Sequence, residues 1–269
     1  MTQMNSPDRP LHLYLSPHLD DVPLSCAGLI KNQRKLDHRV LVVTFFTGDP
    51  AEPLSPLAER YHAVWNRGAQ PFAWRRQEDA AAAMALGAEF RHEGMLDAIY
   101  RTAQSGSPLY SNVAATFEAV HDQDTRTVDE IEARVSNLIE RLRPTYVYAP
   151  VGIGRHVDHQ AVILASKRIQ YQRLTHLRLY EEWPYASGKF PKERPASLEE
   201  ALRFFDWLPA DSTTETIDLP GRIAVARCYT SQIEELFGDD QTMCKMVEEY
   251  SFQVGGAEPA ERYWTPSRG

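Results

Sequence analysis

An uninterrupted apolar run, RVLVVTFF at positions 39–46, limits the folds open to this chain. A strand without polar alternation is typical of a sheet that is covered on both faces. A shorter apolar segment at 11–15 and a helical pattern at 23–36 precede the run, and turn residues at 47–50 end it. This succession of strand, helix and strand predicts a parallel sheet.

The alternation continues along the chain. We expect further helices at 74–86, 127–142 and 158–171, and strands at 88–91, 145–149 and 177–181. The C-terminal third carries weaker patterns, which predict a strand at 213–217 and helices at 221–236 and 240–251. The segments 50–72 and 101–125 are interpreted as irregular. The order predicts one α/β domain over residues 1–269, with a mostly parallel sheet and helices on both faces.

Composition excludes several classes of partner. The net charge is −8 and no dense run of Lys and Arg occurs, which argues against nucleic acid or an anionic membrane as the main partner. No stretch approaches the roughly 18 apolar residues of a membrane span. The first residues, MTQMNSPDRP, lack the layout of a secretion signal, and the three cysteines form no CxxC pair. We therefore expect a cytoplasmic protein.

Histidines and aspartates follow two of the predicted strands where these strands end. Three follow the strand at 11–15 and three follow the strand at 145–149: His18, Asp20, Asp21, His156, Asp158 and His159. Sites in open α/β sheets gather at the carboxyl ends of the strands. If the two strands are neighbours, the six side chains converge at one edge of the sheet.

Each loop alone also has a purely structural explanation. Asp20 and Asp21 could cap the helix that follows them, and Asp158 could cap the helix after the second strand. Capping explains aspartates but does not require the histidines that accompany them. The sequence leaves the capping and the chemical interpretation open for each aspartate.

Mixed histidine and carboxylate ligands suit Zn²⁺, and three protein ligands plus a water form the usual catalytic arrangement. One of two adjacent aspartates could bind the metal while the other takes a proton from the metal-bound water. His156 and His159 are three residues apart and would share a helix face. One could ligate the metal while the other polarises a substrate oxygen, and Asp158 could orient an imidazole.

Both motifs resemble a known family. SPHLDDV at 16–22 and GRHVDH at 154–159 are similar to the two motifs of the LmbE-like or PIG-L-like metal-dependent N-deacetylases, and RRQE at 75–78 resembles the R-x-x-E helix of that family. The resemblance implies a Rossmann-like three-layer sandwich with its core at about 11–180, which residues 181–269 complete. It also implies hydrolysis of N-acetylglucosamine conjugates or related acetylamino compounds.

Carried over by position, the resemblance makes His18, Asp21 and His159 the metal ligands. The metal would be Zn²⁺, with Fe²⁺ or Co²⁺ as alternatives. Asp20 becomes the general base, and His156 either stabilises the tetrahedral oxyanion or protonates the leaving amine. With Asp158 as the orienting group, these residues form the predicted catalytic set.

The resemblance also suggests substrate contacts, Arg75 and Asp97. For Arg75 the alternative interpretation is a solvated or ion-paired helix residue, and for Asp97 it is a turn or cap. Two departures from the family pattern weaken the transfer of substrate identity: Val22 stands where many members have Glu, and Leu19 stands where they have Pro. Neither departure affects a predicted ligand or the predicted base.

The predicted function is therefore removal of an N-acyl group, most simply acetyl, from a small sugar-containing molecule. The alternatives are a catalytically inactive metal-binding protein of the same fold and a metal-dependent amidase or phosphoesterase acting on a non-sugar substrate. Aromatic residues cluster at 180–185, 203–209 and 261–266. Core packing or a homo-oligomer contact is favoured over stacking on a sugar ring as their role. No GxSxG motif supports a serine hydrolase.

Overall fold

Seven strands form one sheet in the computed structural model, which describes residues 9–65, 71–172, 176–191, 195, 197–207 and 210–267. The strands are β1 (Leu11–Ser16), β2 (Arg39–Phe46), β3 (Glu89–Met95), β4 (Tyr146–Pro150), β5 (Leu177–Tyr180), β6 (Ala210–Thr216) and β7 (Ala260–Pro266). Their order is β3-β2-β1-β4-β5-β7-β6. The first five pair in parallel, and β7 runs antiparallel to β5 and β6. The predicted mostly parallel sheet is confirmed.

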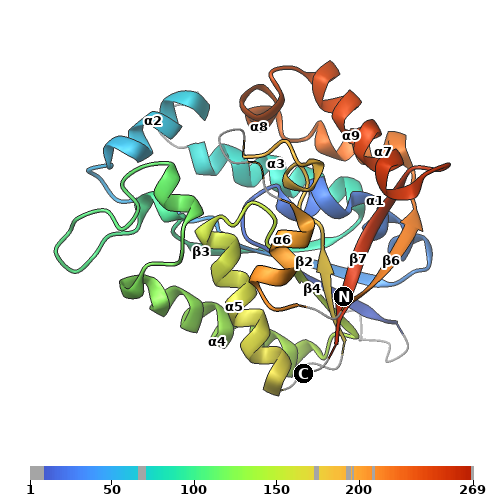
Figure 1. Cartoon of the computed structure of the whole chain (residues 1–269), viewed down its shortest axis with the longest axis horizontal. Helices are drawn as coiled ribbons and strands as arrows, with labels where there is room; N and C mark the ends of the chain where they lie inside the picture. The colour runs from blue at the N-terminus through green and yellow to red at the C-terminus, as the bar shows by residue number, and fades with distance from the viewer. Residues whose placement is uncertain are drawn as a thin grey trace, which may run out of the picture.

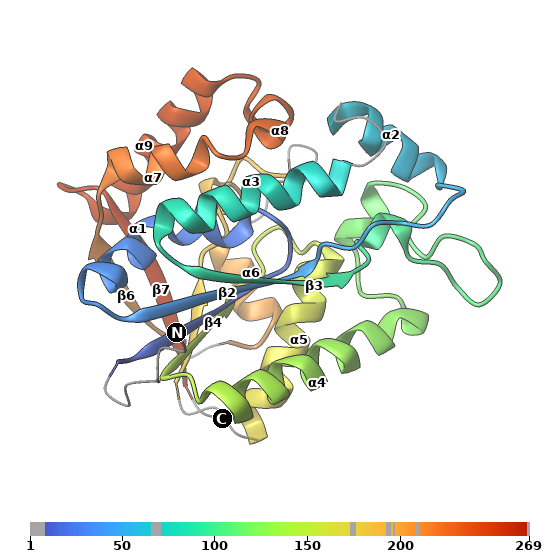
Figure 2. The same ribbon diagram turned by 180° about the vertical axis from the view of Figure 1, so that it is seen from behind.

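Helices cover both faces of the sheet (Figure 1). They are α1 (Asp21–Lys35), α2 (Pro56–Trp65), α3 (Pro71–Leu86), α4 (Thr125–Leu142), α5 (Val157–Gln172), α6 (Leu198–Phe204), α7 (Leu219–Ala226), α8 (Thr230–Gln232) and α9 (Asp240–Gly255), with a π-helical turn at Ile233–Phe237. Figure 2 shows the sheet between a layer that contains α1, α3, α7 and α9 and a layer that contains α4 and α5. The predicted three-layer α/β sandwich is confirmed.

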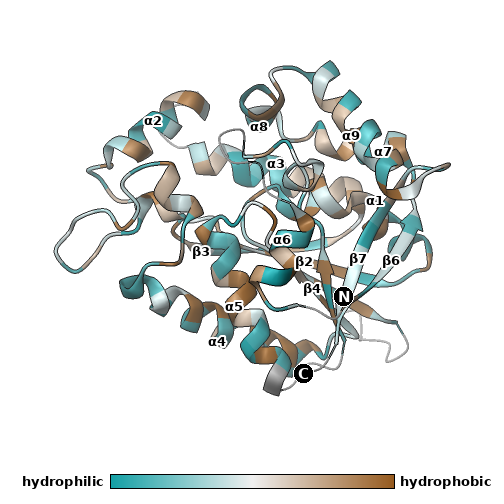
Figure 3. Ribbon diagram, viewed as in Figure 1, coloured by the Kyte–Doolittle hydropathy of each residue, from teal (hydrophilic) through white to brown (hydrophobic). Residues whose placement is uncertain are grey.

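Successive residues of one strand pack into opposite layers, as the pleat requires. Leu13 and Leu15 of β1 belong to the core beneath α4 and α5, whereas Tyr14 belongs to the core beneath α1 and α3. In β2, Val43 belongs to the core beneath α4 and α5, and Val42 belongs to the core beneath α1 and α3. Brown, apolar positions therefore predominate along β2 in Figure 3. Burial on both faces explains the uninterrupted apolar run in the sequence.

The chain order of the strands reverses at β1. Leu13 lies opposite Leu41 of β2 on one side and opposite Val147 of β4 on the other. The two strands whose ends carry the histidines and aspartates are therefore neighbours. A crevice forms at the carboxyl ends of the strands at such a switch point, so the fold brings both loops to one place.

The structure differs from the sequence prediction mainly outside the parallel core. The segment at 50–72, interpreted as irregular, contains α2 and the start of α3, although residues 66–70 lie outside the described part. The helix predicted at 221–236 is interrupted after Ala226 and continues as α8 and the π-helical turn. Among the described helices, none combines the length and apolar character that crossing a membrane requires.

The strand β7 was missed, because its sequence, AERYWTP, was interpreted only as an aromatic cluster. Trp264 pairs with Leu179 of β5, and Tyr263 pairs with Tyr180. Aromatic residues favour strands, yet only the long-range pairing decides that this segment enters the sheet. The C-terminal segment thus extends the same sheet that carries the two motif loops.

Candidate active site

The loop after β1 is held by its own side chains. Ser16 Oγ donates a hydrogen bond to the His18 carbonyl oxygen at 2.8 Å and accepts one from the Val22 N–H at 3.3 Å. The His18 N–H donates to Asp21 Oδ2 at 2.8 Å. Asp20 stands at the N-cap of α1, but its side chain makes no capping hydrogen bond. The capping interpretation is therefore wrong for Asp20.

The imidazoles of two predicted site residues lie around a carboxylate oxygen of a third. Asp21 Oδ2 lies 3.3 Å from His18 Nδ1 and 3.2 Å from His159 Nε2. One donor atom from each of these residues lies within 4.8 Å of the others. Two imidazoles and a carboxylate at this spacing match the ligand chemistry of zinc and similar divalent metals.

The surroundings of this donor set favour a positive charge. His159 Nε2 is buried and makes no hydrogen bond within the described chain, although it faces Asp21. Burial alone would lower the pKa of His159, but Asp21 and Glu182 raise it to about 9. A cation between these groups is therefore stabilised, and the three residues fit a divalent metal.

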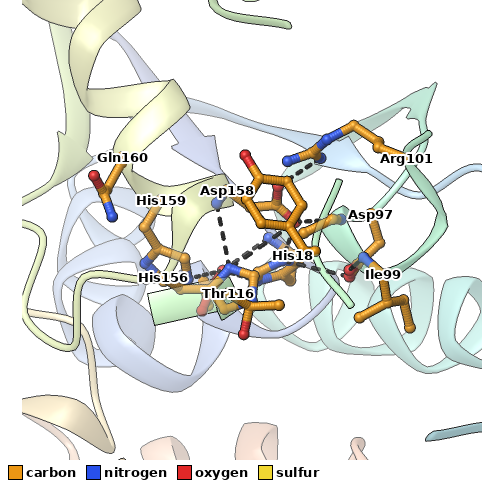
Figure 4. Close-up of polar contacts among 12 residues, drawn as sticks. His18, Asp97, Ile99, Arg101, Thr116, His156, Asp158, His159 and Gln160 are labelled. Atoms are coloured by element: carbon orange, nitrogen blue, oxygen red, sulfur yellow. Dashed lines mark hydrogen bonds and ion pairs between the residues drawn. The ribbon is translucent and has the colours of Figure 1, made fainter. Parts of the chain in front are cut away.

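Each of the two imidazoles turns its other nitrogen toward a buried carboxylate. His18 Nε2 lies 3.0 Å from Asp158 Oδ2 (Figure 4), and His159 Nδ1 lies 3.2 Å from Glu182 Oε1. Both carboxylates are fully buried. Such partners fix the orientation and the tautomer of metal-binding histidines.

Asp158 is also held by groups other than His18. Arg101 Nη1 lies 2.6 Å from Asp158 Oδ1, and the Ala98 N–H donates to Asp158 Oδ2 at 3.0 Å. Burial would raise the pKa of Asp158, but Arg101 and the hydrogen bond with His18 hold it below its usual range. Asp158 therefore contacts groups outside its own helix α5, which speaks against a simple capping role.

Glu182 was not among the residues predicted from the sequence. It follows β5, and besides His159 its carboxylate accepts hydrogen bonds from the backbone N–H groups of Gly152 at 2.8 Å and Ile153 at 3.3 Å. The only signal in the sequence is the position of YEEWPY after the strand next to β4. The aromatic residues of that segment indicated core packing or an oligomer contact, so the glutamates between them were not considered as site residues.

Replacing Glu182 by glutamine is expected to weaken metal binding by about 10- to 100-fold, the effect typical of partners that orient a ligand. The neutral amide can no longer hold the His159 Nδ1–H as a carboxylate does. Competition with a chromophoric chelator measures the affinity. Glu181→Gln is the matched control, because Glu181 instead contacts Arg262 and Trp264. Equal affinities in the two variants would contradict this role.

His156 offers a second arrangement of donors. With His18 and Asp158 it forms another set whose donor atoms lie within 4.8 Å. The Asp158 N–H donates to His156 Nδ1 at 3.3 Å. Burial lowers the pKa of His156 to about 3, against the attraction of Asp158. Both sets include His18, so the described chain offers two overlapping arrangements of donors.

Asp20 and Arg75 form a buried pair at the floor of a cavity. Arg75 Nη2 lies 3.4 Å from Asp20 Oδ2, and its guanidinium lies over the Trp65 ring, 5.0 Å from the centroid. Burial raises the pKa of Asp20 to about 6; the charge of Arg75 opposes this and that of Asp21 adds to it. The structure thus brings the predicted base and a predicted substrate contact together.

Asp97 has two contacts. Its Oδ1 accepts the Ile99 N–H at 3.1 Å, which caps the short helix at Ala98–Tyr100, and its Oδ2 lies 3.5 Å from His18 Nε2 (Figure 4). The capping alternative is therefore correct for one oxygen. The other oxygen faces the donor set at the edge of the cavity.

A cavity of about 420 Å³ opens above these groups. His18, Asp20, Asp21 and Asp97 line its floor together with Arg75 and His156. Its walls come from α2, from the loop after β5 and from the end of α8 with the π-helical turn: Tyr61, Trp65, Trp183, Tyr185, Gln232 and Leu236 are among the wall residues. The walls are mostly apolar, with several aromatic side chains, and the floor is charged, as in many small-molecule sites.

The chain as a whole is similar to known proteins. Residues 13–169 match the family described as PIG-L: GlcNAc-PI de-N-acetylase. The chain is 27% identical to a 2'-N-acetylparomamine deacetylase of Niallia circulans over 272 residues, which cover 96% of this chain and 91% of the relative.

Two solved structures are also similar. The zinc-inhibited form of the teicoplanin deacetylase Orf2 has a TM-score of 0.80 and 28% identity, and the match covers 96% of this chain and 98% of that chain. The A40926 pseudoaglycone deacetylase Dbv21 has a TM-score of 0.77 and 29% identity, with 97% and 98% covered.

Proposed function

This chain belongs to the PIG-L (GlcNAc-PI de-N-acetylase) family, and we propose that it is a metal-dependent hydrolase that removes an N-acetyl group from an amino-sugar conjugate. The observation that carries the proposal is the position of Asp21 between two imidazoles, with Asp20 beside it on the floor of the cavity. The similarity to deacetylases of N-acetylparomamine and teicoplanin supports an amino-sugar substrate.

The proposed metal ligands are His18, Asp21 and His159, and Zn²⁺ is the proposed metal, with Fe²⁺ or Co²⁺ as alternatives that suit the same donors. When bound, the metal lowers the pKa of a water molecule and polarises the amide carbonyl. Asp158 and Glu182 act as positioning residues, because each holds the outer nitrogen of one imidazole.

Asp20 is the proposed general base. Its carboxylate lines the cavity and makes no hydrogen bond that caps α1. Its Oδ2 lies 3.4 Å from Arg75 Nη2. In the forward step Asp20 accepts the proton of the attacking water. It then returns this proton to the nitrogen of the leaving amine as the C–N bond breaks, and the second proton of the water also ends on the amine, so that amide plus water gives acetate plus the protonated amine.

His156 is the proposed donor to the developing oxyanion. Its Nδ1 accepts the Asp158 N–H at 3.3 Å, which places the ring proton on Nε2. A neutral imidazole that lines the cavity can donate that N–H as negative charge grows on the carbonyl oxygen. Burial lowers the pKa of His156 to about 3 and keeps the ring neutral. A neutral imidazole is a weak acid, which favours the oxyanion role of His156 over protonation of the amine.

Arg75 and Asp97 are the proposed substrate contacts. Arg75 presents several N–H donors on the floor of the cavity, and its Nε makes no hydrogen bond within the described chain. A guanidinium donates to oxygen atoms of a sugar or of a linking group. Asp97 Oδ1 is used by the cap, and its Oδ2 accepts a hydrogen bond from a hydroxyl or amide group of the substrate.

A screen for acetate release tests this function. The metal-loaded protein is incubated with N-acetylglucosamine glycosides and other N-acetylated amino sugars, and with phosphomonoesters in parallel. We expect acetate and no phosphate. An inactive metal-binding protein would release neither product, and a phosphoesterase would release phosphate; either result would contradict the proposal.

A further inference from the structure

The segment 229–237 forms one wall of the cavity and is fastened to α3 by two consecutive acids. Glu78 accepts hydrogen bonds from the Ser231 N–H at 2.8 Å and from the Ser231 hydroxyl at 2.5 Å. Asp79 accepts a hydrogen bond from the Tyr229 hydroxyl at 2.7 Å. These bonds join parts of the chain about 150 residues apart, so this wall has a fixed position relative to α3.

Gln232 follows directly on the fastened residues. Its side chain is buried, lines the cavity and donates one hydrogen bond from Nε2 to Ser231 Oγ at 3.0 Å. That is the only hydrogen bond of this carboxamide within the described chain. A carboxamide has two N–H donors and an accepting oxygen. One N–H and the oxygen therefore remain for a ligand in the cavity.

The backbone after Gln232 is unusual in the same place. The residues Ile233–Phe237 form a π-helical turn, and Leu236 within it also lines the cavity. Single π-helical turns are rare and occur frequently at functional sites. The turn widens the helix at the wall and ends at Gly238, whose φ of 84° needs glycine.

The helix α3 links this wall to the floor of the cavity. Arg75 and Glu78 are three residues apart and lie on one face of α3. Arg75 reaches Asp20 on the floor, and Glu78 holds Ser231 in the wall. The R-x-x-E pattern in the sequence therefore sets the distance between the proposed base and Gln232.

We propose that Gln232 is a specificity-determining residue that hydrogen-bonds a ring hydroxyl of the amino-sugar unit. This inference rests on the proposed function and names the part of the substrate that the wall recognises. An uncharged carboxamide can both donate to and accept from a hydroxyl group. A buried polar group discriminates well against a ligand that leaves it unpaired. Glu78 acts as a positioning residue through Ser231.

The test combines one variant with a series of substrates. Met is close to Gln in length but cannot replace the hydrogen bonds of its carboxamide. We expect Gln232→Met to lower kcat/KM about tenfold on an N-acetylglucosamine glycoside, the size of one neutral hydrogen bond. The 3-, 4- and 6-deoxy analogues of this glycoside each lack one hydroxyl. On the analogue that lacks the hydroxyl bound by Gln232, the wild type and Gln232→Met should have the same lowered kcat/KM. Gln241→Met, at an exposed position of α9, is the matched control and should change nothing.

The outcomes separate the two levels of the proposal. Suppose that the wild-type protein deacetylates the glycosides. If kcat/KM of Gln232→Met is then lower by the same factor on every deoxy analogue, or is not lower at all, the proposed role of Gln232 is wrong, while the proposed deacetylase activity stands. If the metal-loaded wild type releases no acetate from any glycoside, the proposed function fails and the inference with it. A tenfold lower kcat/KM of Gln232→Met that disappears on one deoxy analogue supports both the proposed function and the role of Gln232. The hydroxyl missing from that analogue is then the one that Gln232 binds.

Discussion

Asp20→Asn is expected to lower kcat for acetate release about a thousandfold, within the range of about 10² to 10⁴ that a general base contributes. Asparagine keeps the shape of the side chain but cannot accept a proton from water. The metal should stay bound, because Asp20 belongs to neither of the donor sets in the described chain. Steady-state kinetics with metal analysis of the same sample measure both effects.

Asp211→Asn serves as the control, because Asp211 is exposed on β6. It should keep full activity and full metal content. Normal turnover in Asp20→Asn would remove this residue from the mechanism. Loss of metal in Asp20→Asn would mean that it is a ligand and that the roles of the two adjacent aspartates are exchanged.

Asp21→Asn is expected to lose the metal and the activity together. Asp21 Oδ2 contacts both imidazoles and also accepts the His18 N–H, so the carboxylate organises the whole donor set. Removing a ligand should weaken metal binding by more than about a hundredfold, the upper end of what an outer orienting partner contributes. Chelator competition and acetate release at limiting metal provide the measurements.

The pair of variants separates neighbouring residues with different tasks. Asp21→Asn should fail in metal binding, whereas Asp20→Asn should fail only in turnover. Full metal content and activity in Asp21→Asn would rule out the proposed ligand set. The alternative set of His18, His156 and Asp158 would then become the metal site.

Much of the site could be predicted because parallel strands end at one edge of a sheet. The motifs after β1 and β4 are about 140 residues apart in sequence, yet β1 and β4 are neighbours. That pairing brings His18 and Asp158 within 3.0 Å of each other. The family resemblance suggested Arg75 as a substrate contact; in the structure Arg75 lines the cavity and pairs with Asp20.

Other parts depend on which way a side chain faces, and no local pattern contains that information. Glu181 and Glu182 are adjacent and alike in sequence, but one contacts Arg262 and the other contacts His159. The helix interrupted near Gln232 was predicted as continuous, because a π-helical turn has no clear sequence signal. In the same way, β7 belongs to the sheet only through pairing with β5 and β6.

The most direct test is a metal titration of the metal-stripped protein with acetate release as the readout. We expect no release without metal, a linear rise up to one equivalent of Zn²⁺ per chain, and a metal-free state that stays inactive toward every N-acetylated amino sugar. Acetate release at the same rate by the metal-stripped protein, or activity that begins only beyond one equivalent, would contradict it.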